Sequence, residues 1–173
     1  MKISIFGLGY VGAVSCACLP ELGHDVIGVD TNPSKVRMIN DGQSPVVEEG
    51  INELIGAAVK AGKLRATDDV EAAVLGSEIS LISVATPSNP NYTPNLTAVD
   101  TVIRSIGAAI RKKGTQHTVV LRSTVPPREL PVVARRRSAI LAGVPAASIG
   151  KSGELREASR LRWAGVLVVL CFC

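Results

Sequence analysis

The sequence lacks several features that whole classes of protein require. Aromatic residues make up 3% of its 173 residues, and it contains four cysteines. That cysteine count is far below the density of a disulfide scaffold, and 46% hydrophobic residues is too high for a disordered chain. No apolar run reaches the roughly 18–20 residues of a membrane span, and the N-terminal apolar run is too short for a signal peptide. We therefore expect a cytoplasmic protein of about one domain, with no membrane partner.

Acidic residues are scarce in the C-terminal part of the chain. Residues 1–100 hold 12 Asp/Glu and 6 Lys/Arg, whereas residues 101–173 hold 3 and 13, and no aspartate follows Asp100. Such asymmetry is typical either of a basic nucleic-acid surface or of two parts with different histories. The run Arg135–Arg137 has no interleaved aromatic residues and no nucleic-acid motif accompanies it. We interpret it as a solvated charge run and expect no nucleic-acid partner.

Strands and helices alternate along the first 121 residues. Short apolar segments predict buried strands at 2–6, 26–29, 79–84 and 118–121. Periodic or capped segments predict helices at 10–22, 33–39, 48–61, 68–75 and 97–113. The last of these is expected to begin with Thr97 and Asp100 in a capping-box-like arrangement. This alternation indicates parallel βαβ units. After about residue 127 the periodicity is lost, although the apolar run 163–173 allows one more buried strand.

The strongest motif is the glycine pattern Gly7-Leu8-Gly9-Tyr10-Val11-Gly12. It follows a predicted strand and opens a predicted helix, and Asp30 follows 18 residues later at the end of the next strand. This context is the dinucleotide-binding fingerprint of a Rossmann-type fold, in which a doubly wound parallel sheet carries helices on both faces. A glycine turn between strand and helix with no ligand is the alternative interpretation.

Each position of the glycine pattern has its own expected role. Gly7 permits the tight turn, Gly9 lets the backbone approach a pyrophosphate, and Gly12 lets helix and strand pack closely. The helix then presents free backbone N–H groups, at Tyr10 and Val11, and the positive end of its dipole to the phosphates.

Polar side chains near the strand ends complete the predicted cofactor site. A carboxylate at Asp30 can accept hydrogen bonds from both ribose hydroxyls and repels a 2′-phosphate, which favours NAD over NADP. Lys35, one helical turn on, can reach the ribose or a phosphate, or be a solvated helix lysine. Thr86 and Thr124 each follow a strand end, where open α/β sheets bind ligands. Both hydroxyls are candidate cofactor contacts, and simple strand-ending turns are the alternative.

Five motifs in this order resemble the N-terminal NAD-binding domain of nucleotide-sugar dehydrogenases, the family of UDP-glucose and GDP-mannose dehydrogenases. They are GLGYVG, GVD, SPVVEEG, VATP and RSTVPP, and the resemblance covers residues 1–127. The opening residues are most similar to the GDP-mannose branch, which serves alginate-type polysaccharide synthesis. Glu49 departs from the family, which usually has proline there. Residues 153–157 are similar to the last part of the family's PEFLRE segment.

The resemblance implies a chemistry. The family oxidises a sugar C6 alcohol to a carboxylate by two hydride transfers to two NAD molecules, and a cysteine holds the intermediates as a thiohemiacetal and a thioester. A lysine and an asparagine support the oxyanion, and a threonine and a glutamate position water. Thr124 and Glu157 fall on the matching positions of the last two. The resemblance also implies a nucleotide-sugar substrate and a homo-oligomeric parent enzyme.

The family's catalytic thiol, lysine and asparagine have no counterpart in these 173 residues. Cys16 and Cys18 are expected to pack within the first helix, and Cys171 and Cys173 end the chain in an apolar run. Their spacing does not match a metal site, so none is expected. His24 and His117 are both expected at the surface.

We therefore expect a Rossmann NAD-binding domain at residues 1–127, truncated before the family's middle helix and C-terminal domain. Residues 128–173 are expected to be an aberrant C-terminal segment of uncertain fold, and our hypothesis for its origin is a frameshift. The chain is expected to bind NAD weakly without completing sugar oxidation. The alternatives are a UDP-glucose 6-dehydrogenase, a β-hydroxyacid dehydrogenase and a non-catalytic NAD-binding module.

Overall fold

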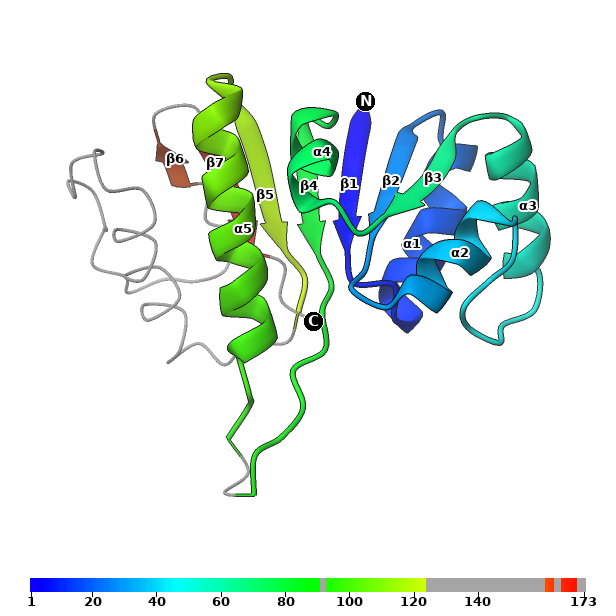
Figure 1. The fold of residues 1–173 in the computed structure, drawn as a ribbon, viewed down its shortest axis with the longest axis horizontal. Helices are drawn as coiled ribbons and strands as arrows, with labels where there is room; N and C mark the ends of the chain where they lie inside the picture. The colour runs from blue at the N-terminus through cyan, green and yellow to red at the C-terminus, as the bar shows by residue number, and fades with distance from the viewer. Residues whose placement is uncertain (91–92, 124–160, 164–165, 171–173) are drawn as a thin grey trace.

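A single twisted sheet organises the chain (Figure 1). The computed structural model describes residues 1–90, 93–123, 161–163 and 166–170. In these described residues seven strands lie in the order β3-β2-β1-β4-β5-β7-β6, and among them only β6 runs antiparallel to its neighbour. The strands are β1 (Lys2–Phe6), β2 (Asp25–Val29), β3 (Leu64–Thr67), β4 (Ile79–Ile82), β5 (His117–Leu121), β6 (Leu161–Trp163) and β7 (Val166–Leu170). The strand order reverses between β1 and β4, as it does in a doubly wound Rossmann sheet.

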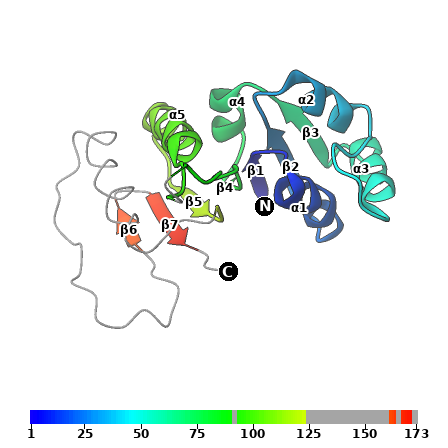
Figure 2. The ribbon, with the colours of Figure 1, turned by 90° about the horizontal axis from the view of Figure 1, so that it is seen from below.

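Five helices connect these strands and cover both faces of the sheet. They are α1 (Tyr10–Glu21), α2 (Pro33–Asn40), α3 (Ile51–Lys60), α4 (Val70–Leu75) and α5 (Thr97–Lys113). Figure 2 shows α1 and α5 on opposite sides of the sheet. Within the described part of the chain, no helix has the length and apolar character needed to cross a membrane.

Two hydrophobic clusters fill the two sides. Successive strand residues point to opposite faces, so the neighbours Ile5 and Phe6 enter different clusters. Phe6 packs with residues of α4 and α5, such as Val74 and Ile106. Ile5 packs with residues of α1, α2 and α3, such as Cys16, Ile39 and Ile55. Because each fully buried large aliphatic side chain contributes about 1.5–3 kcal/mol, the two clusters hold the strand ends in a fixed arrangement.

The structure confirms the predicted fold class and adds one early strand. Each predicted strand and helix is present, with ends that differ by up to three residues. The additional strand, β3, has the sequence LRAT, in which only two side chains are buried. It is an edge strand on one side of the sheet. On its free side the Asn40 amide nitrogen donates to the Ala66 carbonyl at 3.0 Å, and the Ala66 N–H donates to Asn40 Oδ1 at 2.7 Å.

The predicted cap of α5 is wrong. Leu96 occupies the N-cap position and no side chain of that residue caps the helix. Instead, the Asn95 side-chain oxygen accepts a hydrogen bond from the Thr97 N–H at 3.0 Å. Asp100 pairs with Arg104 at 3.0 Å, one turn along the helix. An asparagine two residues upstream has therefore taken the place of the predicted capping box.

The C-terminal apolar run does contain a strand. β7 pairs in parallel with β5 along five residues, from His117 opposite Val166 to Leu121 opposite Leu170. β6 then pairs with β7 in antiparallel fashion. Residues 124–160, which include Thr124 and Glu157, lie outside the described residues, so the division at residue 127 stays a prediction.

Candidate functional site

The glycine turn between β1 and α1 is tightly packed on its inner side. Gly7 has a φ of 97°, in the region that favours glycine. A Cβ at Gly12 would lie 1.8 Å from the Gly7 carbonyl oxygen, because the first turn of α1 rests directly on the turn. Ser83, just after β4, lies at the same place, and its hydroxyl donates to the Gly7 carbonyl oxygen at 3.0 Å. The turn therefore lies at the point where the strand order reverses.

The outer side of the same turn is open. A Cβ built at Gly9 meets no other atom of the described residues within 4 Å. Gly9 is the N-cap of α1 and offers no side chain to its first N–H groups. These N–H groups have no partner within the helix, because an α-helix leaves its first four donors unpaired. Open space beside free donors and a positive helix end is suited to a phosphate group.

Asp30 links the end of β2 to the glycine turn. Its Oδ2 accepts a hydrogen bond from the Leu8 N–H at 2.7 Å, and its Oδ1 accepts one from the Asn32 N–H at 2.9 Å. The Lys35 ammonium lies 3.7 Å from Oδ2. The Asp30 side chain is 12% exposed, and each carboxylate oxygen can accept more than one hydrogen bond. The carboxylate is thus anchored from inside the protein and retains acceptor capacity toward a ligand.

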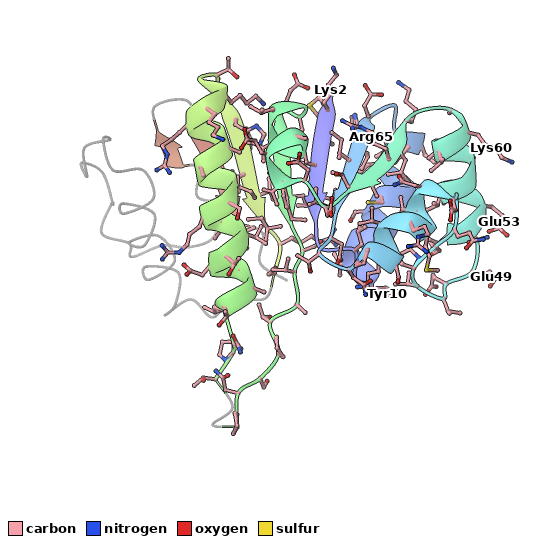
Figure 3. All side chains as sticks on the ribbon, viewed as in Figure 1. Lys2, Tyr10, Glu49, Glu53, Lys60 and Arg65 are labelled. Atoms are coloured by element: carbon pink, nitrogen blue, oxygen red, sulfur yellow. The ribbon has the colours of Figure 1, made fainter. Side chains whose placement is uncertain are left out.

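Tyr10, the first residue of α1, directs its side chain away from the turn. Its hydroxyl donates to Glu48 Oε2 at 2.5 Å, and Figure 3 shows Tyr10 and Glu49, the neighbour of Glu48, on the lower side of the part formed by α1, α2 and α3. The hydrogen bond to Glu48 and the charge of that carboxylate raise the pKa of Tyr10. The phenol of Tyr10 is therefore engaged with Glu48, and its backbone N–H is the group available to a ligand at the start of α1.

The carboxyl ends of β4 and β5 are joined to each other. The Ser123 hydroxyl donates to the Val84 carbonyl at 2.7 Å, and the Arg122 N–H donates to the Ile82 carbonyl at 2.9 Å. Thr86 follows β4 at this edge and is half-buried. The segment that continues from it toward α5 projects beyond the strand ends (Figure 1). Thr86 thus lies at the carboxyl edge of the sheet, where the sequence placed it. Thr124, the other predicted hydroxyl, lies outside the described residues, which end at Ser123 in this segment.

The structure brings together most of the residues predicted from the sequence. The glycine turn, the start of α1, Asp30 and Lys35 form one continuous group, with Thr86 further along the same edge. Sequence reasoning missed Ser83 and Glu48. A hydroxyl directly after an apolar strand was the available signal for Ser83, whereas nothing local predicts that Glu48 meets Tyr10, 38 residues away.

Two surface and packing expectations are wrong. His117 is fully buried rather than at the surface, because it begins β5 beneath α5. Cys18 is exposed, whereas Cys16 is buried as expected. Burial raises the pKa of the Cys16 thiol to about 12, so this thiol is inert at neutral pH.

Residues 1–140 match the family described as "UDP-glucose/GDP-mannose dehydrogenase family, NAD binding domain". The chain is 52% identical over 127 residues to a GDP-mannose 6-dehydrogenase of Azotobacter vinelandii, and 40% identical over 128 residues to a UDP-glucose 6-dehydrogenase of Haloferax volcanii. These alignments cover 73% and 74% of this chain and 29% of each relative. The chain therefore spans less than a third of the length of these curated relatives.

Solved structures show the same likeness. A GDP-mannose dehydrogenase from Pseudomonas aeruginosa, solved as a ternary complex, superposes with a TM-score of 0.79 at 48% identity. A UDP-glucose dehydrogenase from Pyrobaculum islandicum superposes with a TM-score of 0.76 at 38% identity. Each covers 82% of this chain, which corresponds to 33% of the solved chain.

Proposed function

The chain belongs to the UDP-glucose/GDP-mannose dehydrogenase family, as its NAD-binding domain, and from this premise we propose that it binds NAD for the oxidation of a nucleotide sugar at C6. The observation that carries the proposal is the open space at Gly9 beside the free N–H groups of α1. A pyrophosphate fits this chemistry, because it is anionic and needs close approach to backbone donors.

We assign the cofactor contacts to one continuous set of residues. In this assignment the turn Gly7, Gly9 and Gly12 gives the backbone its close approach, and the N–H groups of Tyr10 and Val11 hold the phosphates. Asp30 accepts from the ribose hydroxyls, Lys35 contacts the ribose or a phosphate, and Thr86 and Thr124 contact the nicotinamide end. The anchored negative charge of Asp30 supports NAD over NADP, because a 2′-phosphate would meet it directly.

The proposed substrate is GDP-mannose, which would be oxidised to GDP-mannuronate. The support is the name of the Azotobacter vinelandii relative, and UDP-glucose is the competing substrate because the Haloferax volcanii relative carries that name. Oxidation of an alcohol to a carboxylate uses one water and reduces two NAD molecules, and NAD supplies the hydride acceptor in both stages. Thr124 and Glu157 would position that water.

The wider setting belongs to the same proposal. We assign the parent enzyme to the cytoplasm and to alginate-type polysaccharide synthesis, and we expect it to be a homo-oligomer. The 173 residues alone are expected to bind NAD without oxidising the sugar, because they hold no counterpart of the family's catalytic thiol. A non-catalytic NAD-binding module would show the same behaviour in isolation.

Calorimetric titration of the purified chain tests the cofactor assignment. We expect NAD to bind and NADP to bind at least tenfold more weakly, because Asp30 opposes the 2′-phosphate. Equal affinity for the two dinucleotides would contradict the role of Asp30, and failure of both to bind would overturn the proposed function.

A chimera then separates an enzyme domain from a binding module. Residues 1–127 of this chain would replace the matching 127 residues of the Azotobacter vinelandii relative, and NADH formation would be followed with GDP-mannose and with UDP-glucose. We expect oxidation of GDP-mannose by the chimera and no NADH from the 173-residue chain alone. A folded, NAD-binding chimera without activity would favour the non-catalytic module.

A further inference from the structure

A network of buried polar side chains crosses the sheet at the edge opposite the candidate NAD site. Ser4 lies on β1, Ser77 follows α4, Ser80 lies on β4, His117 begins β5, and Lys113 ends α5. The three serines and His117 are each at most 2% exposed. The amino ends of these strands and the C-terminal end of α5 lie together at one edge of the molecule (Figure 1). We call these five residues the serine–histidine latch.

The hydrogen bonds of the latch run in one direction. The Lys113 ammonium lies 3.1 Å from His117 Nδ1 and 3.1 Å from the Val74 carbonyl oxygen, and it also donates to the Ser77 carbonyl. An ammonium has three donors and no acceptor, so Nδ1 must accept, and the imidazole proton must be on Nε2. Nε2 then donates to Ser80 Oγ at 2.7 Å.

The three serines continue the chain of donors. Because Ser80 Oγ accepts from His117, its own proton is free to go to Ser4 Oγ, 2.9 Å away. Ser4 can in turn donate to the Ile79 carbonyl at 3.3 Å. The Ser77 hydroxyl lies 2.9 Å from Ser4 Oγ and 2.8 Å from the Ala73 carbonyl oxygen, which joins the end of α4 to the chain. Every polar atom of these buried side chains is therefore satisfied when His117 is neutral, and the network joins β1, β4 and β5 to one another, to the turn after α4 and to the end of α5.

The contact of Ser80 with His117 resembles a nucleophile and its general base, but the third partner has the wrong charge. In a serine triad a carboxylate accepts from the second imidazole nitrogen and stabilises the imidazolium. Here Lys113 occupies that position and opposes the imidazolium. The pair is also inaccessible, because neither side chain has exposed surface. The network is therefore suited to holding a neutral histidine and not to catalysis.

We propose that the serine–histidine latch is a proton-sensitive lock, in which protonation of His117 expels Lys113 and releases α4, α5 and β5 from one another. A proton on Nδ1 would place a donor and a positive charge against the ammonium. Lys113 would then withdraw from the Val74 and Ser77 carbonyls at the end of α4. Because α4 and α5 cover one face of the sheet, the NAD-binding fold would loosen in acid.

The charges around the latch do not relieve this conflict. The Glu78 carboxylate attracts Lys113, and its Oε2 also accepts from the Lys2 N–H at 2.8 Å. On α4, Glu71 is engaged by Lys112 at 2.6 Å. From the other side β7 pairs with β5, and its sequence VLVVL contains no titratable residue. Among the described residues, no carboxylate hydrogen-bonds to the imidazole.

The sign of the pH effect follows from the environment of His117. Burial first, and the charge of Lys113 second, lower the pKa of His117 from 6.5 to about 4, against the smaller opposing effect of a hydrogen bond with the Ser77 backbone. Between pH 4 and pH 6.5, His117 is therefore protonated in the unfolded chain and neutral in the folded chain. The stabilisation is complete above pH 6.5 and is lost as the pH falls toward 4. At pH 5 this linkage weakens the folding equilibrium constant by about 30-fold relative to pH 7.5.

Nuclear magnetic resonance of the imidazole nitrogens tests the lock in the full 173-residue chain. At pH 7.5 we expect His117 to carry its proton on Nε2, and we expect it to titrate well below pH 6.5. A proton on Nδ1, or titration near 6.5 with no loss of structure, would overturn the proposal. This readout needs no NAD, so its outcome is independent of the proposed function.

Urea unfolding at pH 7.5 and pH 5 tests the consequence with matched variants. His117→Gln removes the titrating group, and His24→Gln removes the only other histidine of the chain. We expect His24→Gln to keep the about 30-fold loss between the two pH values and His117→Gln to lack most of it. If both variants lose stability equally with acid, the lock is refuted. Should His117→Gln fail to fold, the wild-type imidazole titration decides the question.

Discussion

Gly12 shows how a single missing side chain determines the geometry of the candidate site. Because Gly12 has no side chain, the first turn of α1 can pack directly against the Gly7 carbonyl. A Cβ at Gly12 would lie only 1.8 Å from that carbonyl oxygen. Gly9, three residues earlier, faces open space and has a φ of −77°, which any residue adopts. The two glycines are thus needed for different reasons, one for packing and the other for the approach of a ligand.

Alanine substitutions at these two positions should separate stability from binding. Gly12→Ala forces backbone atoms apart, and we expect it to lower the free energy of unfolding by about 3 kcal/mol or more. Gly9→Ala should leave stability nearly unchanged and weaken NAD binding at least tenfold, because its methyl group enters the proposed phosphate space. Urea unfolding and calorimetric titration measure the two effects. A Gly9→Ala chain that binds NAD normally would contradict the proposed pose.

At the residue scale, local motifs were predictable and long-range partners were not. The glycine pattern and Asp30 are defined by spacing along the chain, and the structure places them together. The burial of His117 depends on Ser80 and Lys113, which come from other elements. A histidine before a strand has no local signal that distinguishes a surface position from a buried one.

Together with β6, the edge strand β3 is one of two described strands that apolar patterning failed to predict. Its short alternating sequence buries only Leu64 and Ala66, whereas the central strands are nearly continuous apolar runs. The Asn40 side chain occupies part of its free edge by pairing with both backbone groups of Ala66. Protected edges of this kind reduce pairing with other chains. A single asparagine at the end of α2 thus acts as a short substitute for a neighbouring strand.

Graded substitution of Asn40 tests this edge protection. Asn40→Asp keeps an acceptor for the Ala66 N–H and loses the donor to its carbonyl, whereas Asn40→Ala loses both. Each hydrogen bond contributes about 1 kcal/mol. We therefore expect Asn40→Asp to lower the free energy of unfolding by about 1 kcal/mol and Asn40→Ala to lower it by about 2 kcal/mol. Urea unfolding measures the loss, and light scattering measures self-association. Equal stability of all three chains would show that water replaces the amide without cost.

At the scale of the whole molecule, one sheet unites the two ends of the sequence. β5 lies between β4 and β7, so residues 117–121 pair with strands from both sides of residue 127. The loss of periodicity after residue 127 predicted an aberrant segment, yet the apolar composition of residues 166–170 suits a buried parallel strand. Composition therefore predicted this strand, while its partner could only be found from the fold.

Deletion of residues 161–173 tests the pairing with an internal control. The N–H groups of Thr118 and Arg122 donate toward β4, so those of Val119 and Leu121 point to the β7 side. In the shortened chain we expect hydrogen exchange to accelerate at Val119 and Leu121 and to change little at Thr118. Unchanged exchange at all of these amides would show that β7 does not protect β5 in solution.

Asp30 has a consequence for anyone who would re-engineer cofactor preference. Exchanging this carboxylate for a small neutral residue is the obvious first step toward accepting NADP, since it removes the charge that a 2′-phosphate would meet. In this chain the same substitution also removes the acceptor of the Leu8 and Asn32 N–H groups. A redesign would have to supply a new internal acceptor for the glycine turn together with the new phosphate contact. If Asp30 has the proposed role, cofactor selectivity and the hydrogen bonding of the glycine turn depend on the same side chain and must be changed together.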